Sequence, residues 1–194
     1  MALTLIGTPL VLTTSDTALC EYDITSGIDD TYDSYEFHFA NMHPETNNVD
    51  FSFQVNAYDP SAGTPQLTGF NETMTTTHVE AYHLESDAGT PTVTYGASYD
   101  QAEGVAAYNI ISRTIGNDAD QSASGVLTLY APSSTTYVKH FLSDSNASVV
   151  AGSSYTFHSK TAGYINTALA ITQISFKMSS GDIHAGTIKM FGVS

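Results

Sequence analysis

The amino-acid sequence predicts an all-β protein, an antiparallel β-sandwich of the jelly-roll kind that ends in a C-terminal closing hairpin. Three observations support this prediction. Threonine, serine, tyrosine, valine and isoleucine are abundant, which favours strands. Short apolar runs recur about every ten residues with turn signals between them, as in sandwiches and barrels. No internal repeat or linker divides the 194 residues, so we expect a single domain spanning residues 1–194.

The first expected elements are short strands at residues 3–6 and 10–12, separated by the break Gly7-Thr8-Pro9, and a further strand at residues 19–24. The start has no basic region and no cleavage motif, and glycine and proline interrupt its apolar run. We therefore expect neither a signal peptide nor a membrane span, and a soluble protein made inside a cell. Cys20, the one cysteine, excludes an intrachain disulfide and is expected to be a small buried core residue.

The two strongest strand patterns lie at residues 35–39 and 49–55. In both, aromatic or aliphatic side chains alternate with polar ones, so every second residue faces the core. Burying each aromatic side chain contributes about 2–3 kcal/mol, which specifies the register of both strands. Because the linking residues 41–48 are turn-prone throughout, we expect the two strands to be neighbours in one sheet.

The middle of the chain shows weaker patterns. Residues 58–72 form a loop punctuated by proline and glycine, and are the best place for an exposed functional excursion. Residues 74–84 fit neither the helical nor the strand period clearly. Residues 125–130 predict a strand whose partner, residues 136–142, follows a turn at Pro132.

The C-terminal stretch, residues 171–193, organises the predicted fold. Apolar residues alternate strictly with polar ones from Ile174 to Met178, and a second apolar run closes the chain at Val193. The short connection Ser179-Ser180-Gly181-Asp182 predicts that the two runs form an antiparallel hairpin. A chain that ends inside a strand must be tied down by pairing, so we expect the last strand in the middle of a sheet.

The charge is strongly acidic and unevenly distributed along the chain. There are 20 acids and five bases, a net charge of −15. Residues 1–112 carry about −16 and residues 113–194 about +1, because the first base is Arg113. Such a surface repels phosphate backbones, so we predict no nucleic-acid partner. It serves either solubility in a salty medium or docking onto a basic partner.

No pattern for catalysis appears. The seven histidines form no HxH, HExxH or HxxxH motif, and no G-x-S-x-G elbow is present. Glu36 and Asp50, on the two strongest strands, are the one carboxylate pair expected to face a common surface, and polar decoration explains them better than sugar hydrolysis. We therefore predict that the chain is not an enzyme, with no catalytic residue, no cofactor and no metal.

Two acidic loops leave a calcium alternative open. Asp118-Ala119-Asp120 begins like an EF-hand loop, but the glycine and the glutamate required later in such a loop are missing. Asp29, Asp30 and Asp33 stand beside Gly27 and could also donate carboxylate oxygens. Capping and turn formation explain both clusters without a metal.

Aromatic residues in irregular segments are the best candidates for surface contacts. They are Tyr58, Phe70, Tyr95 and Tyr99. Tyrosines on loops commonly anchor protein–protein interfaces. Stacking aromatics accompanied by acids and amides also hold sugars, so a glycan is the alternative partner.

Four strings resemble a family of virion structural proteins from tailed bacteriophages that infect marine bacteria. They are ITSGIDDTYDSYEFHFANMHP (residues 24–44), NNVDFSFQVN (47–56), IGNDADQSASGVLTLYAPSSTTYVKHF (115–141) and ISFKMSSGDIHAGTIKMFGV (174–193). The resemblance implies a β-sandwich subunit that assembles on the particle in the host cytoplasm and carries no active site.

Together these observations predict an accessory capsid decoration, or cement, subunit on the exterior of the virion. Its expected partners are the major capsid protein or tail components and further copies of itself, without nucleic acid or membrane. The alternative is the adhesive head of a tail fibre or appendage that binds a host surface glycan through residues 58–72 and 95–99. A sugar-cleaving sandwich enzyme is the third and least favoured class.

Overall fold

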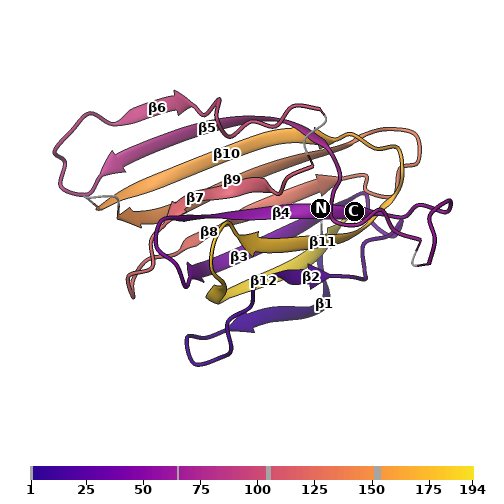
Figure 1. Cartoon of the computed structure of the whole chain (residues 1–194), viewed down its shortest axis with the longest axis horizontal. Coiled ribbons are helices and arrows are strands. Elements are labelled where there is room, and N and C mark those ends of the chain that lie inside the picture. Colours follow the sequence, from indigo (N-terminus) through magenta and orange to yellow (C-terminus); the bar gives the residue numbers. More distant parts are fainter. Residues whose placement is uncertain (1, 65, 104–105, 151–153) are drawn as a thin grey trace.

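The structure is a computed structural model and describes residues 2–64, 66–103, 106–150 and 154–194. Those residues contain twelve β-strands and no helix suited to crossing a lipid bilayer. The strands form two antiparallel sheets packed together, which confirms the predicted all-β sandwich (Figure 1). The strands are β1 (Leu3–Leu12), β2 (Tyr22–Ile24), β3 (Ser34–Pro44), β4 (Val49–Ala57), β5 (Met74–Leu84), β6 (Thr92–Tyr95), β7 (Asn109–Ile115), β8 (Ala123–Tyr130), β9 (Lys139–Val150), β10 (Ser154–Ile165), β11 (Ile171–Met178) and β12 (Ile183–Val193).

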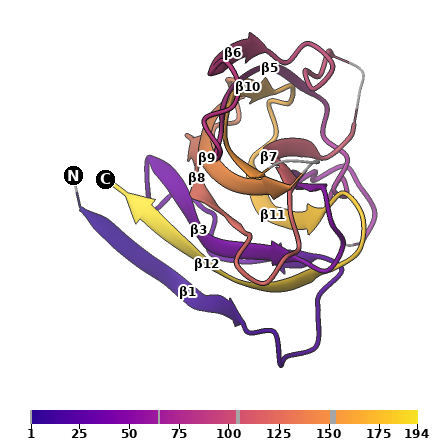
Figure 2. The same cartoon turned by 90° about the vertical axis from the view of Figure 1, so that its left-hand side faces the viewer.

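The two sheets differ in size. The large sheet has eight strands in the order β1-β12-β3-β8-β9-β10-β5-β6, and the small sheet has four in the order β2-β11-β4-β7. The large sheet curves around the small one (Figure 2). Its edges are β1 and β6, so β12 lies inside the sheet with a partner on each side. The expectation that the last strand is tied down within a sheet is therefore confirmed.

Aromatic side chains from both sheets fill the space between them. Phe37 and Phe39 of β3 pack on the small sheet, with ring centroids 5.6 Å from Phe176 of β11 and 5.4 Å from Phe51 of β4. All four are buried almost completely. Each contributes about 2–3 kcal/mol by leaving water, so this cluster defines how the sheets face each other.

The predicted C-terminal hairpin is wrong, because its two strands belong to different sheets. β11 pairs with β2 and β4 in the small sheet, whereas β12 pairs with β1 and β3 in the large one. The connecting segment is bound to the start of β4, where the Ser179 N–H donates to the Asp50 carbonyl at 2.8 Å and the Ser179 hydroxyl accepts from the Asp50 N–H at 3.0 Å. The segment between β11 and β12 thus connects the small sheet to the large sheet instead of forming a tight hairpin turn. Period-two alternation marks the buried face of each run but not its neighbour.

The predicted pairing of the two strongest strands is also wrong. β3 lies between β12 and β8, while β4 lies between β11 and β7. The two strands face each other across the core through Phe39 and Phe51 instead of lying side by side. The turn-prone link is compatible with either arrangement. Packing the aromatic side of β3 against the aromatic side of β4 removes more apolar surface from water than pairing the two strands side by side would.

Several smaller expectations are settled by the pairing. β8 pairs with β9, as predicted, and residues 74–84 are a strand, β5. Residues 3–12 form one strand with a register shift between Ile6 and Leu10 rather than two separate strands.

Cys20 is exposed, not buried as predicted. The backbone of its neighbour Leu19 exchanges hydrogen bonds with Ile183 at 3.0 and 2.7 Å, and because successive side chains point to opposite sides, Cys20 faces outward.

Candidate functional site

The four aromatic residues proposed for surface contact lie in different environments. Tyr58 is 44% exposed, and its hydroxyl donates to Gln66 Oε1 at 2.9 Å, which closes the loop after β4. Tyr95, on the edge strand β6, is 56% exposed, and its hydroxyl donates to the Asp100 carboxylate. That hydrogen bond raises the pKa of Tyr95. Phe70 is half-buried.

Tyr99, the fourth, is engaged by neighbouring side chains. The guanidinium of Arg113 lies 3.4 Å from the centre of its ring, a cation–π contact. The ring also meets His78 edge-on, with centroids 5.7 Å apart. Tyr99 therefore covers a buried charged cluster, and its contacts link it to β5 and β7 instead of to Tyr58.

That buried cluster, which sequence reasoning missed, consists of His78 and Glu80 on β5, Arg113 on β7 and Thr161 on β10. Glu80 Oε1 accepts from Arg113 and lies 3.1 Å from His78 Nε2. His78 Nδ1 lies 2.7 Å from the hydroxyl of Thr161. Burial lowers the pKa of His78, against the opposing effect of the Glu80 carboxylate. The Thr161 hydroxyl donates to the Ile110 carbonyl at 3.1 Å, which ties the cluster to the backbone of β7. The detectable signal was the i, i+2 spacing of His78 and Glu80, which puts both on one face of a strand.

The outward side of the large sheet forms one surface that crosses several neighbouring strands. Cross-strand pairing aligns Lys160, Asp144, Val126 and His38 in one row across β10, β9, β8 and β3. A parallel row contains Ala162, Leu142, Thr128 and Glu36. Leu142 and Val79 are large apolar residues exposed on this face. We call this surface, made by the outward side chains of β3, β5, β8, β9 and β10, the outer face.

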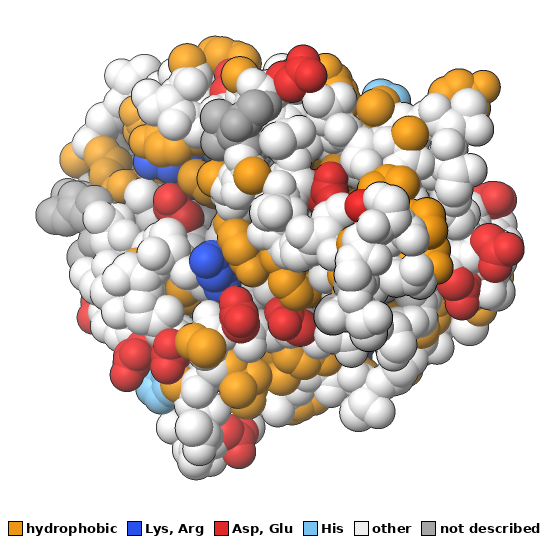
Figure 3. Space-filling view, turned by 45° about the vertical axis from the view of Figure 1, so that its right-hand side comes forward, with side chains coloured by type: hydrophobic (Ala, Val, Ile, Leu, Met, Phe, Trp, Pro, Cys, Tyr) orange, Lys and Arg blue, Asp and Glu red, His pale blue; other side chains and the backbone are white. Residues whose placement is uncertain are grey.

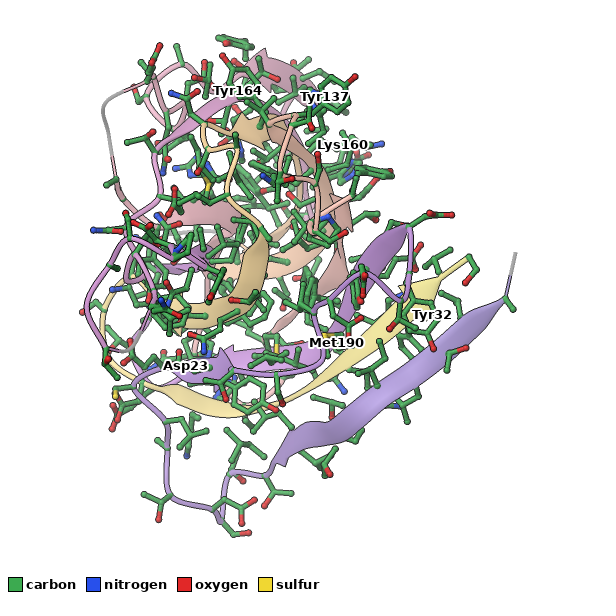
Figure 4. The ribbon with its side chains drawn as sticks, turned by 90° about the vertical axis from the view of Figure 1, so that its right-hand side faces the viewer. Asp23, Tyr32, Tyr137, Lys160, Tyr164 and Met190 are labelled. Carbon is green, nitrogen blue, oxygen red and sulfur yellow. The ribbon has the colours of Figure 1, made fainter. Side chains whose placement is uncertain are left out.

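Two adjoining hollows mark the outer face. One, of about 520 Å³, is lined by the apolar residues Val79, Val126, Leu142 and Ala162 and by the ion pair of Lys160 with Asp144. The other, of about 400 Å³, shares Leu142 and Ala162 and adds Tyr130, His140 and Tyr164. Ala162, a small side chain, lines both hollows. Lys160 points outward from the ribbon (Figure 4).

The outer face carries few of the chain's acids. Of the 20 acids, three stand within the eight strands of the large sheet, and one of these, Glu80, is buried on the inner side. Glu36 contacts His38 at 2.7 Å, and Asp144 contacts Lys160 at 2.8 Å and His158 at 2.7 Å. The hydrogen bond from Lys160 is the main reason that the pKa of Asp144 is lowered. Acidic side chains are instead scattered over the molecule as seen in Figure 3.

A polar cleft of about 680 Å³ opens where the ends of β3 and β12 meet the loop before β8. The cleft lies where the pairing of β3 with β8 and the pairing of β12 with β3 both contain register shifts. Its lining includes His43, His184, Glu45, Asp120 and Gln121. The rings of His43 and His184 lie 5.6 Å apart, and His43 Nδ1 lies 2.7 Å from the carbonyl of Gln121. Within the described ranges, no three or more His, Cys, Asp or Glu residues are grouped closely enough to hold a metal ion.

The carboxylate pair expected on one surface is not brought together. Glu36 lies on β3 in the large sheet, and Asp50 lies on β4 in the small sheet, where Oδ1 accepts from the Thr114 N–H at 2.9 Å. The pairing of β3 with β4, on which this expectation depended, does not exist.

Comparisons with protein-family models, with curated proteins and with solved structures found no match to this chain. The likeness to virion structural proteins of tailed bacteriophages therefore stays a prediction made from the sequence strings.

Proposed function

We propose that this chain is a non-enzymatic virion structural protein, an accessory decoration subunit that docks on the exterior of a bacteriophage capsid through its outer face. The supporting observation is that the outer face holds few of the chain's acidic residues. In a chain of net charge −15, the outer face has two acids, Glu36 and Asp144, and each contacts a histidine or lysine on the same face.

Desolvation and charge repulsion favour docking through the outer face. Unpaired carboxylates are costly to bury in an interface, whereas apolar side chains and paired charges cost less. The hollows around Leu142 and Ala162 provide apolar surface that a partner side chain can fill. The exposed acids elsewhere on the molecule would then face solvent, where they keep neighbouring subunits and whole particles apart.

The first test is immunogold electron microscopy of intact particles with an antibody against this chain. Gold distributed over the head supports the decoration proposal, and gold confined to the tail supports the adhesin alternative. Absence of gold from every particle refutes both virion proposals.

The second test measures binding of the purified protein to capsids that lack it. Leu142→Glu puts an unpaired carboxylate in the centre of the outer face and should weaken binding by at least about tenfold. Tyr58→Glu introduces the same charge at an exposed residue outside that face and should leave capsid binding unchanged. Equal loss in both variants, or loss in Tyr58→Glu alone, would contradict docking through the outer face.

The adhesin alternative is favoured by one observation, the exposure of Tyr58 and Tyr95, whose rings are available for stacking on a sugar. Its test is binding to host cells by the wild-type protein and by Tyr58→Ala and Tyr95→Ala. Weaker cell binding in either variant, with capsid binding intact, would support it.

A further inference from the structure

The first strand is an open edge of the large sheet. β1 pairs with β12 and with no other strand in the described ranges. Figure 2 shows it as the outermost strand on its side of the sandwich. The opposite edge, β6, has four residues, while β1 has ten. Because backbone groups of an edge strand alternate between its partner and the open side, β1 presents unpaired N–H and C=O groups in its two regular stretches, residues 3–6 and 10–12.

β1 also lacks the charges that usually protect an edge. Its sequence, LTLIGTPLVL, contains no ionisable side chain, and the first in the chain after Met1 is Asp16. Leu3 and Leu5 are 51% and 49% exposed, and Val11 is 63% exposed. Natural proteins commonly place lysines or other charges on edge strands to prevent pairing with another chain. β1 has instead one interruption, the register shift between Ile6 and Leu10.

The strand is nevertheless held firmly in place. Its inward side chains Ile6, Leu10 and Leu12 pack against the core, and its register with β12 is continuous from Leu3 to Ile6. The edge is thus presented in an ordered, extended form that a second strand can join without a cost of ordering.

We propose that two copies of this chain pair antiparallel through β1, so that their large sheets become one continuous sheet across a two-fold axis. A second copy is the partner indicated by charge, since two molecules of net charge −15 are least repelled where both present an uncharged strand. An antiparallel pair of identical strands is self-complementary, as a two-fold interface requires. With the axis perpendicular to the sheet, Leu3 and Leu5 of both copies lie on the same face and cover each other. Phe191 of β12, the cross-strand partner of Leu5, lies beside them on that face. This inference does not depend on the proposed capsid function.

The mass in solution, measured by sedimentation equilibrium, tests the pairing. The wild-type chain should show twice the 20.7 kDa monomer mass. Leu5→Glu puts like charges at the joined edge and should raise the dimer dissociation constant by at least about tenfold. Val93→Glu makes an equivalent change at β6, the other edge, and should leave the dimer intact. A monomeric wild-type protein at about 100 μM, a dimeric Leu5→Glu variant of unchanged affinity, or dissociation caused by Val93→Glu would each overturn the proposal.

Amide hydrogen exchange at two protein concentrations locates the interface directly. Amides of residues 3–6 that are unpaired in the monomer should exchange more slowly at the higher concentration, and those of β6 should not change. Concentration-dependent protection elsewhere without protection in β1 would place the dimer interface on another surface and refute the β1 pairing. Leu5→Glu changes the β1 edge, whereas the docking proposal concerns Leu142. Measuring capsid binding by the Leu5→Glu variant therefore distinguishes a failure of the dimer proposal from a failure of the docking proposal.

Discussion

Replacing Lys139 by methionine should remove a pH-dependent penalty on the folded state. Lys139 is 0% exposed, and its Nζ donates to the Thr167 carbonyl at 3.0 Å. Burial lowers the pKa of this lysine from 10.5 to about 8, partly opposed by the negative charge of Glu72. Methionine fills a similar volume without a charge, so the variant keeps the packing of β9 and loses the titration.

The sign and size of the effect follow from linkage. A lysine with a lower pKa in the folded state binds fewer protons there than in the unfolded chain, so stability rises with pH between the two pKa values. The penalty is fully present below about pH 8 and is lost as the pH approaches 10.5. Each pKa unit is equivalent to about 1.4 kcal/mol, so the stability difference between wild type and Lys139→Met should change by about 2 kcal/mol from pH 8 to pH 10.

Urea unfolding followed by far-ultraviolet circular dichroism at several pH values between these limits measures that difference. Tyrosine ionisation occurs in both proteins and cancels in the comparison. A flat difference for Lys139→Met would show that Lys139 titrates alike in the folded and unfolded chains, and the reasoning from burial would be refuted.

Two further changes test the interior. Phe51→Ala removes a buried ring that packs on both Phe39 and Phe176 and should lower the free energy of unfolding by about 3–5 kcal/mol, measured by urea unfolding; a loss below about 1 kcal/mol would contradict the packing. Arg113→Met leaves the Glu80 carboxylate buried without its cation and should cost about 3–5 kcal/mol by the same assay. The double variant Arg113→Met with Glu80→Gln should recover part of that loss, and the absence of any recovery would show that the ion pair is not its source.

The candidate site illustrates how much of a surface is visible in a sequence. The exposed alternation of His140, Leu142 and Asp144 along β9 is detectable as a period of two, and it identifies which side chains share a face. The sequence cannot show that β8 and β10 flank this strand, or that Ala162 lowers the surface beside Leu142, because those relationships depend on register between segments distant in the chain.

By itself the sequence determined the all-β class, the inward aromatic residues of β3 and β4 and the strongly acidic net charge. These properties are local or additive, since the period of alternation and the residue counts do not depend on partners. Only the tertiary structure decided that β11 and β12 belong to different sheets, that the outer face holds few acids, and that β1 is an open edge. The reason is physical: alternation specifies which side of a strand is buried, whereas the choice of neighbour depends on the aromatic packing between sheets, which brings together residues far apart along the chain.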